Sequence, residues 1–186
     1  LLNLICGLLT AEQGTILMNG SPISEDSARI GYMLQKDHLL EWRSIYRNVL
    51  LGLEIRGELT KENLSYVDHM LKLYELDKFR NQRPSQLSGG MRQRAALIRT
   101  LALKPDLLLL DEPFSALDYQ TRLNVSDDIG KILKKQKKPA ILVTHDISEA
   151  ISMADRVLIL SHRPATVVKI IPIDLNMKDR TPLTSR

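Results

Sequence analysis

Four polar side chains stand just after apolar runs that have the composition of strands, and each is of a type that can act on a phosphate ester. Gln35 ends one such run, Asp111 and Glu112 follow four consecutive leucines, and His145 ends a third run. A carboxylate can hold Mg²⁺, a neighbouring carboxylate can polarise a water, and an imidazole or amide can reach a terminal phosphate or the metal ion. Singly, each is more often an ordinary loop residue.

A fifth candidate is the tripeptide Ser88-Gly89-Gly90, which stands at the start of a predicted helix. A serine cap leaves backbone N–H groups of the first turn directed outward, and the helix dipole favours an anion there. Ser-Gly-Gly is also a common plain turn, so this segment predicts a phosphate contact only in combination with other signals.

Strands alternate with helices along most of the chain, and this order predicts an α/β fold in which ligands bind at the carboxyl ends of the strands. The unbroken leucine run favours a strand buried on both faces, as in a parallel sheet. The predicted strands are 15–18, 30–34, 107–110, 140–144, 157–160 and 167–171, and the predicted helices are 45–55, 64–76 with Thr60 as a cap, 88–103, 120–135 and 147–153.

The bulk composition is that of one globular domain, with 44% hydrophobic and 26% charged residues in 186. One cysteine, Cys6, excludes a disulfide framework and a cysteine cluster for zinc, and it fits a reducing, cytosolic setting. The apolar stretch 1–9 is too short to span a bilayer. The basic run 131–138 is interpreted as a solvated helix end, so nucleic acid is not expected as a partner.

Taken in order, the motifs resemble those of the ATP-binding cassette (ABC) transporter ATPases. They match the Q-loop at Gln35, the signature LSGGMRQR at 87–94, the Walker B strand LLLLDEP at 107–113, the D-loop SALD at 115–118 and the H-loop THD at 144–146. The resemblance implies a layered parallel sheet of the P-loop NTPase type. Residues 1–186 would form a partial ABC ATPase domain, with a helical subdomain at about 38–103 and a tail at about 176–186.

The resemblance also implies roles for the strand-end residues in binding and hydrolysing ATP. Glu112 would be the general base for the hydrolytic water, and His145 would contact the γ-phosphate. Gln35 and Asp111 would help to position Mg²⁺.

In this family two ATPase subunits pair head to tail. The signature residues Ser88, Gly89 and Gly90 would therefore face the ATP held by the second subunit, and Asp118 would link the two sites across the dimer. One departure lies in the signature itself, where Met91 replaces the common glutamine. Gln93, two residues on, would point in another direction on the helix.

The larger departure concerns the family's Gly-rich phosphate-binding loop, which should stand immediately before Leu1. No Gly-Lys-Ser or Gly-Lys-Thr sequence occurs in the 186 residues, and the chain opens on leucine, which we interpret as a fragment or a trimmed chain. Without the loop's N–H groups and lysine, we expect the chain alone to hydrolyse ATP negligibly. The strand that accompanies this loop belongs at the centre of the sheet, so we expect a gap or collapsed neighbours there.

The segments 37–43 and 161–164, together with Asn48-Val49, resemble the importer branch that serves nitrate, sulfonates, taurine and related solutes. The expected partners are transmembrane permease subunits and a separate solute-binding protein, and the expected location is the cytoplasmic face of the cell membrane. The permease contact is expected near 39–53, where Trp42 and Tyr46 could form one apolar face or could pack within the helical insert.

Two other functions are compatible with parts of this pattern. The chain could be a non-catalytic partner that contributes only the signature half of a composite site, although its intact Glu112 and His145 favour hydrolysis. An ABC protein acting on DNA or ribosomes is suggested only by the basic second half, and no coiled-coil insertion or second cassette accompanies it.

Overall fold

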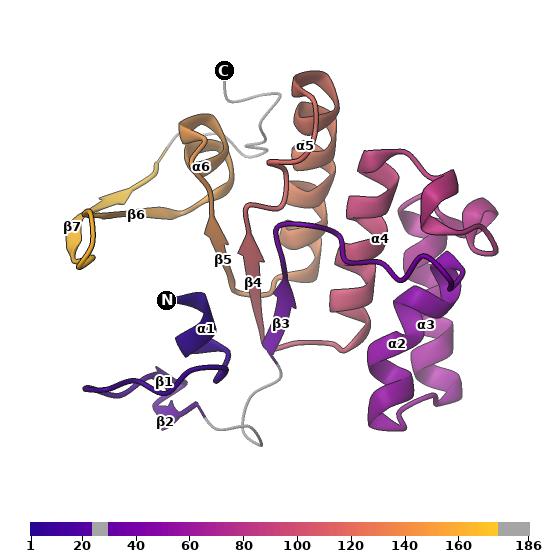
Figure 1. Ribbon diagram of the computed structural model, residues 1–186, viewed down its shortest axis with the longest axis horizontal. Coiled ribbons are helices and arrows are strands. Elements are labelled where there is room, and N and C mark those ends of the chain that lie inside the picture. The colour runs from indigo at the N-terminus through magenta and orange to yellow at the C-terminus, as the bar shows by residue number, and fades with distance from the viewer. Residues whose placement is uncertain (24–29, 175–186) are drawn as a thin grey trace.

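The computed structural model describes residues 1–23 and 30–174. Its centre is a parallel sheet of three strands in the order β3 (Ile30–Met33), β4 (Leu107–Asp111) and β5 (Ala140–Val143) (Figure 1). Leu108, Leu109 and Leu110 are fully buried, as a leucine strand between two layers requires. The parallel pairing places the ends of all three strands at one edge of the sheet, so the predicted α/β fold is confirmed.

Helices connect and cover these strands. Most helices begin at a side chain that accepts a hydrogen bond from the first turn, and Thr60 is such a cap, as predicted. The helices are α2 (Ile45–Arg56), α3 (Lys61–Leu73), α4 (Gly89–Ala102), α5 (Tyr119–Gln136) and α6 (Ile147–Met153), with single 3₁₀ turns at Asp77–Phe79 and Pro84–Gln86.

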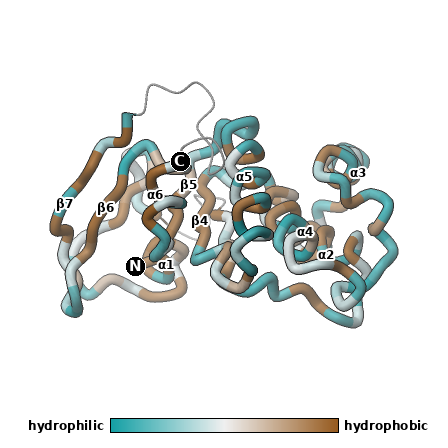
Figure 2. Tube along the Cα trace, turned by 90° about the horizontal axis from the view of Figure 1, so that it is seen from above, coloured by the Kyte–Doolittle hydropathy of each residue, from teal (hydrophilic) through white to brown (hydrophobic). Residues whose placement is uncertain are grey.

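The main core lies between the sheet and the helices α2 to α5. Ile45, Met70, Leu97 and Phe114 are fully buried in it. Figure 2 shows α2, α3 and α4 gathered at one end of the molecule. The helical subdomain predicted at 38–103 contains these helices, but α4 also packs on β3 and α5, so its boundaries stay a prediction. The predicted tail, 176–186, lies outside the described residues.

Two small antiparallel pairs complete the described chain. After α1 (Leu2–Ile5), strand β1 (Leu17–Met18) turns through Asn19 and Gly20, both with left-handed φ, into β2 (Ser21–Pro22). The strand predicted at 15–18 is shorter at its start, because β2 has only two residues to pair with it. Strands β6 (Arg156–Leu160) and β7 (Val167–Pro172) pair with each other.

The strand β5 has one neighbour, β4, in the described part of the chain, and β6 pairs only with β7 in a separate sheet. β5 is also less buried than β4. The far edge of β5 is thus unpaired in the described residues, and the expected gap in the sheet stays a prediction.

Candidate functional site

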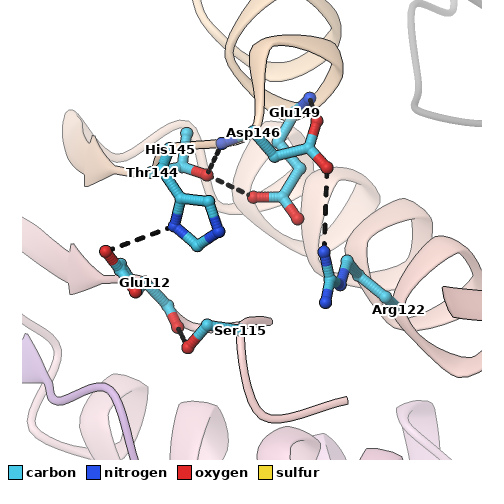
Figure 3. Close-up of a pocket in the computed structure, with 7 residues that line it drawn as sticks. All are labelled: Glu112, Ser115, Arg122, Thr144, His145, Asp146 and Glu149. Atoms are coloured by element: carbon cyan, nitrogen blue, oxygen red, sulfur yellow. Dashed lines mark hydrogen bonds and ion pairs between the residues drawn. The ribbon is translucent and has the colours of Figure 1, made fainter. Parts of the chain in front are cut away.

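Glu112 lies between two of the predicted site residues. Its carboxylate accepts a hydrogen bond from Gln35 Nε2 at 3.0 Å through one oxygen, and its other oxygen is 3.3 Å from His145 Nδ1. The Glu112 backbone N–H donates to Val143 O at the end of β5, which brings it next to the turn that carries His145. Figure 3 shows the imidazole directed at the carboxylate. Three motifs far apart in the sequence therefore meet at one carboxylate.

The backbone at Glu112 is held in a conformation that residues other than glycine rarely adopt, with φ of +42°. Ser115 stabilises this turn, because its hydroxyl donates to Glu112 O at 3.0 Å and accepts from Gln35 Nε2 at 3.3 Å. Strained backbone of this kind is concentrated at functional sites. Ser115 lies within the recognised SALD motif, but sequence reasoning gave it no role.

Asp111 lies one residue before this turn and accepts a hydrogen bond at 3.3 Å from the Tyr32 hydroxyl on β3. The same hydroxyl is 3.5 Å from Asn3 Oδ1. Burial, the Asp111 charge and the hydrogen bond to it all raise the pKa of Tyr32, so the phenol stays protonated and donates. The parallel register aligns Tyr32 with Leu109, close to Asp111, a pairing that sequence reasoning did not identify.

A magnesium ion fits the donor atoms at these strand ends. Asp111 offers a carboxylate, and Gln35 keeps its amide oxygen while its Nε2 contacts Glu112. Among the described residues no group of three or more His, Cys, Asp or Glu could enclose a metal ion. Two oxygen ligands suit Mg²⁺, which is usually held by one or two protein groups with waters and phosphates filling its shell.

A small pocket at the site is lined by side chains from the turn after β4, from α5, from the turn after β5, which includes His145, and from α6 (Figure 3). Thr144 Oγ1 donates to Glu149 Oε2 at 2.6 Å, and Asp146 pairs with Arg122 at 3.8 Å. Burial raises the pKa of the Glu149 carboxyl, although the hydrogen bond from Thr144 lowers it in part. Thr144 and Asp146 belong to the THD motif, whereas sequence reasoning missed Arg122 and Glu149.

The signature tripeptide lies apart from Glu112 within one chain. Ser88 caps α4 by accepting from Met91 N at 3.3 Å. A Cβ on Gly90 would lie 2.7 Å from Val125 Cγ2, so glycine is needed for α4 to approach α5. Among the described residues no hydrogen bond or ion pair joins this tripeptide to Gln35, Glu112 or His145. The amino end of α4 nevertheless faces the same edge of the sheet as the strand ends (Figure 1).

Asp118 forms the amino-terminal cap of α5. Its carboxylate accepts from Thr121 N at 3.1 Å, and its hydrogen bonds with Thr121 lower its pKa, so it is an anion at neutral pH. Met91 packs against the core, and Gln93 is buried in α4, so Gln93 does not take the place of the missing glutamine.

Two carboxylates at the end of β4, a neighbouring histidine and a serine-capped helix lie at one edge of a parallel sheet, an arrangement compatible with an α/β protein that binds and hydrolyses a phosphate compound. The comparisons agree: the family model described as ABC transporter matches residues 1–115. An uncharacterised ABC transporter ATP-binding protein of Bacillus subtilis is 46% identical over 186 residues, which is 100% of this chain and 72% of that protein. The chain therefore belongs to the ABC transporter ATP-binding family, whose complete members are transport ATPases.

Two further comparisons bear on function. A taurine import ATP-binding protein of Rhizobium johnstonii is 41% identical over 174 residues, covering 94% of this chain and 66% of that protein. An ATP-binding cassette solved as a dimer in a post-hydrolysis state, with ADP and phosphate bound, has a TM-score of 0.73 and 29% identity. The match covers 93% of this chain and 79% of that structure.

Proposed function

We propose that the chain is the ATP-hydrolysing subunit of an importer for a small solute, with Glu112 at the centre of its hydrolytic site. The observation that carries the proposal is that Gln35 and His145 contact the two oxygens of one carboxylate, at 3.0 and 3.3 Å. A general base must be held in a fixed orientation and must have an oxygen within reach of the water. Both contacts serve that purpose, and the Glu112 side chain stays 29% exposed to solvent.

In this proposal the protein groups divide the work of hydrolysis. Glu112 takes a proton from the attacking water, and Gln35 orients the carboxylate for it. His145 donates a hydrogen bond to the γ-phosphate, where negative charge is concentrated. Asp111 and Gln35 hold Mg²⁺, which neutralises phosphate charge when it is bound. Tyr32 keeps one Asp111 oxygen in place by its 3.3 Å hydrogen bond.

The complete site is proposed to need two chains. Ser88, Gly89 and Gly90 make no hydrogen bond or ion pair with Glu112 in the described chain, so their outward N–H groups are available to ATP held by a second ATPase subunit. Asp118, an anion at the start of α5, would lie where the two subunits meet. The dimeric form of the ADP-bound structural relative supports this arrangement.

The proposed permease contact is the surface around Trp42, whose residue is 72% exposed. Tyr46 does not share this surface, because its ring packs under the Arg80 guanidinium, 4.1 Å from the ring centre. Of the two alternatives for this pair, the exposure of Trp42 favours a contact surface, whereas Tyr46 packs within the helical insert. No helix among the described residues has the length and apolarity to cross a bilayer.

The solute is proposed to be a small sulfonate such as taurine, or nitrate, delivered by a separate solute-binding protein. Support comes from the segment 37–43 and from similarity to taurine import ATP-binding proteins of Rhizobium johnstonii and Pseudomonas putida, 41% and 39% identical. The subunit would then act at the cytoplasmic face of the cell membrane.

A paired activity measurement tests the catalytic proposal. One sample is the 186-residue chain, and the other carries the corresponding upstream segment of the Bacillus subtilis relative ahead of Leu1. We expect Mg²⁺-dependent ATP hydrolysis only in the second. Glu112→Gln in the extended chain should lower kcat by about 100-fold or more, the usual contribution of a general base, while ATP still binds.

The control separates this function from the alternative. If the extended chain binds ATP but hydrolyses none, and mixing it with a complete ATPase subunit of the relative gives activity that depends on Ser88, the chain is a partner that supplies only the signature half of the site. Hydrolysis that survives Glu112→Gln undiminished would refute the role of Glu112.

A further inference from the structure

The turn 144–146 carries His145, and packing does little to hold its side chain. The imidazole is 68% exposed, although it must meet a defined Glu112 oxygen at 3.3 Å. The turn is only three residues long, between the end of β5 and the start of α6. The direction of the imidazole therefore depends on what fixes the backbone of the turn (Figure 3).

The hydroxyl of Thr144 fixes this backbone on both sides of His145. It accepts a hydrogen bond from Asp146 N at 3.0 Å, so the residue before the histidine is tied to the residue after it. It also donates to Glu149 Oε2 at 2.6 Å, a length typical of a hydroxyl bound to a carboxylate. One hydroxyl thus connects the turn to α6.

Glu149 is only 6% exposed, and burial of a carboxylate is unfavourable unless its partners compensate. Helix capping alone does not explain why Glu149 is buried. In a capping box, a glutamate at the third position of a helix accepts a hydrogen bond from the backbone N–H of the N-cap residue, which here is Asp146. Here the Asp146 N–H donates to the Thr144 hydroxyl, and the Glu149 carboxylate accepts a hydrogen bond from that hydroxyl instead. The Glu149 backbone N–H adds a bond to Asp146 Oδ1 at 3.2 Å.

We propose that Glu149, acting through Thr144, is a positioning residue of the hydrolytic site that sets the place of His145 relative to Glu112. The inference rests on the proposed function of Glu112 and His145 and extends it into α6. Neither Glu149 nor Thr144 touches ATP in this scheme. Their effect reaches the reaction only through the orientation of the imidazole.

The first test needs no ATP and uses the 186-residue chain. The chain has four histidines, so the ring signals of His145 are identified in NMR spectra by their loss in His145→Asn. Glu112→Gln should shift these signals in the wild-type background and in Thr144→Ser, which keeps the hydroxyl. In Thr144→Val, which has nearly the same shape without the hydroxyl, the same change should have no effect on His145.

The second test uses the chain that hydrolyses ATP in the experiment above. Thr144→Val should lower kcat by about 10- to 100-fold, as misplacement of a reacting group does, while KM for ATP changes less than about twofold. Thr144→Ser should restore the lost activity. Where Thr144→Val does not fold, Glu149→Ala and Glu149→Gln replace it, since glutamine keeps an oxygen that can accept from Thr144 and alanine does not.

Each outcome decides one question. A shift of the His145 signals by Glu112→Gln that persists in folded Thr144→Val overturns the positioning role. Activity that Thr144→Val leaves unchanged does the same, provided that Glu112→Gln abolishes hydrolysis in parallel. If Glu112→Gln also leaves hydrolysis unchanged, the proposed function itself fails, and the NMR result then stands as a structural observation only.

Discussion

Glu112 and Glu149 line the same pocket but differ in their burial and in their hydrogen-bond partners. Glu112 contacts polar side chains from two other motifs and its side chain is 29% exposed, whereas Glu149 is buried and bound to the Thr144 hydroxyl. The first arrangement suits a group that exchanges a proton with water, and the second suits a group that holds a neighbour in place. A carboxylate's burial and partners, more than its residue type, indicate which of these tasks it performs.

The raised pKa of Glu149 predicts how stability changes with pH. Burial and the Asp146 charge raise this pKa, and the Thr144 hydrogen bond and the charges of Arg122 and His145 lower it, with a net increase. The folded chain then binds the proton more tightly than the unfolded chain. The contribution of this carboxyl to the free energy of unfolding should therefore fall as the pH rises from the ordinary glutamate pKa through the raised pKa of the folded chain.

Urea unfolding of wild type and Glu149→Gln across this pH range checks the sign. The wild type should lose stability relative to the neutral variant as pH rises. A constant difference, or one that favours the wild type at higher pH, would contradict the prediction.

Sequence alone could bring Gln35, Glu112 and His145 together, because each ends an apolar run and the ends of parallel strands share one edge. It could not find Tyr32 or Glu149 as partners. The contact of Tyr32 with Asp111 depends on the register between β3 and β4, which the sequence pattern leaves open. The role of Glu149 depends on its burial, and a glutamate in a short helix is ordinarily solvated.

At the scale of elements, the close approach of β3 to α4 depends on the absence of a side chain at Gly31. A Cβ there would lie 2.7 Å from Thr100 Cγ2, 3.0 Å from Pro105 Cγ and 3.1 Å from Leu108 Cδ2. These neighbours belong to the buried layer beneath the strand ends. The strand that leads to Gln35 is thus positioned by α4, the helix that begins within the signature motif.

Gly31→Ala should lower the free energy of unfolding by about 1–3 kcal/mol, because overpacking in a tight layer forces its neighbours to shift. Gly130→Ala is the matched control, since a Cβ on that residue of α5 would meet only Met153 Cε, at 3.9 Å. There alanine should raise stability by about 0.5–1 kcal/mol, the usual gain over glycine within a helix. Equal effects at both positions, measured by urea unfolding, would show that the close packing at Gly31 has no energetic consequence.

At the scale of the whole molecule, the described chain has an open sheet. β5 has one partner, and the β6–β7 ribbon exposes apolar side chains that include Leu158, Val168 and Ile170. Unpaired strand edges and exposed apolar ribbons favour pairing with other chains. The α/β class was predictable from the alternation of elements, but the separation of β6 and β7 into their own sheet was not, because pairing partners depend on what adjoins each edge.

The 186-residue chain should therefore self-associate as its concentration rises, as sedimentation velocity can measure. Replacing both Val168 and Ile170 by lysine should reduce this association, because charge on an edge strand opposes pairing. A chain that stays monomeric at high concentration, or a double variant that associates as strongly as wild type, would show that the β6–β7 ribbon does not mediate self-association.

The separation of Ser88 from Glu112 within one chain has a consequence for inheritance. In a two-chain assembly, a subunit damaged at Glu112 still lends its signature segment to its partner, and a subunit damaged at Ser88 still lends its base. A cell that carries both defective alleles would assemble some mixed pairs of subunits. In such a pair one site has an intact Glu112 and an intact Ser88, while the other site has both defects. Two recessive mutations in the same gene would then complement each other, at about half of one normal pair's activity in each mixed pair.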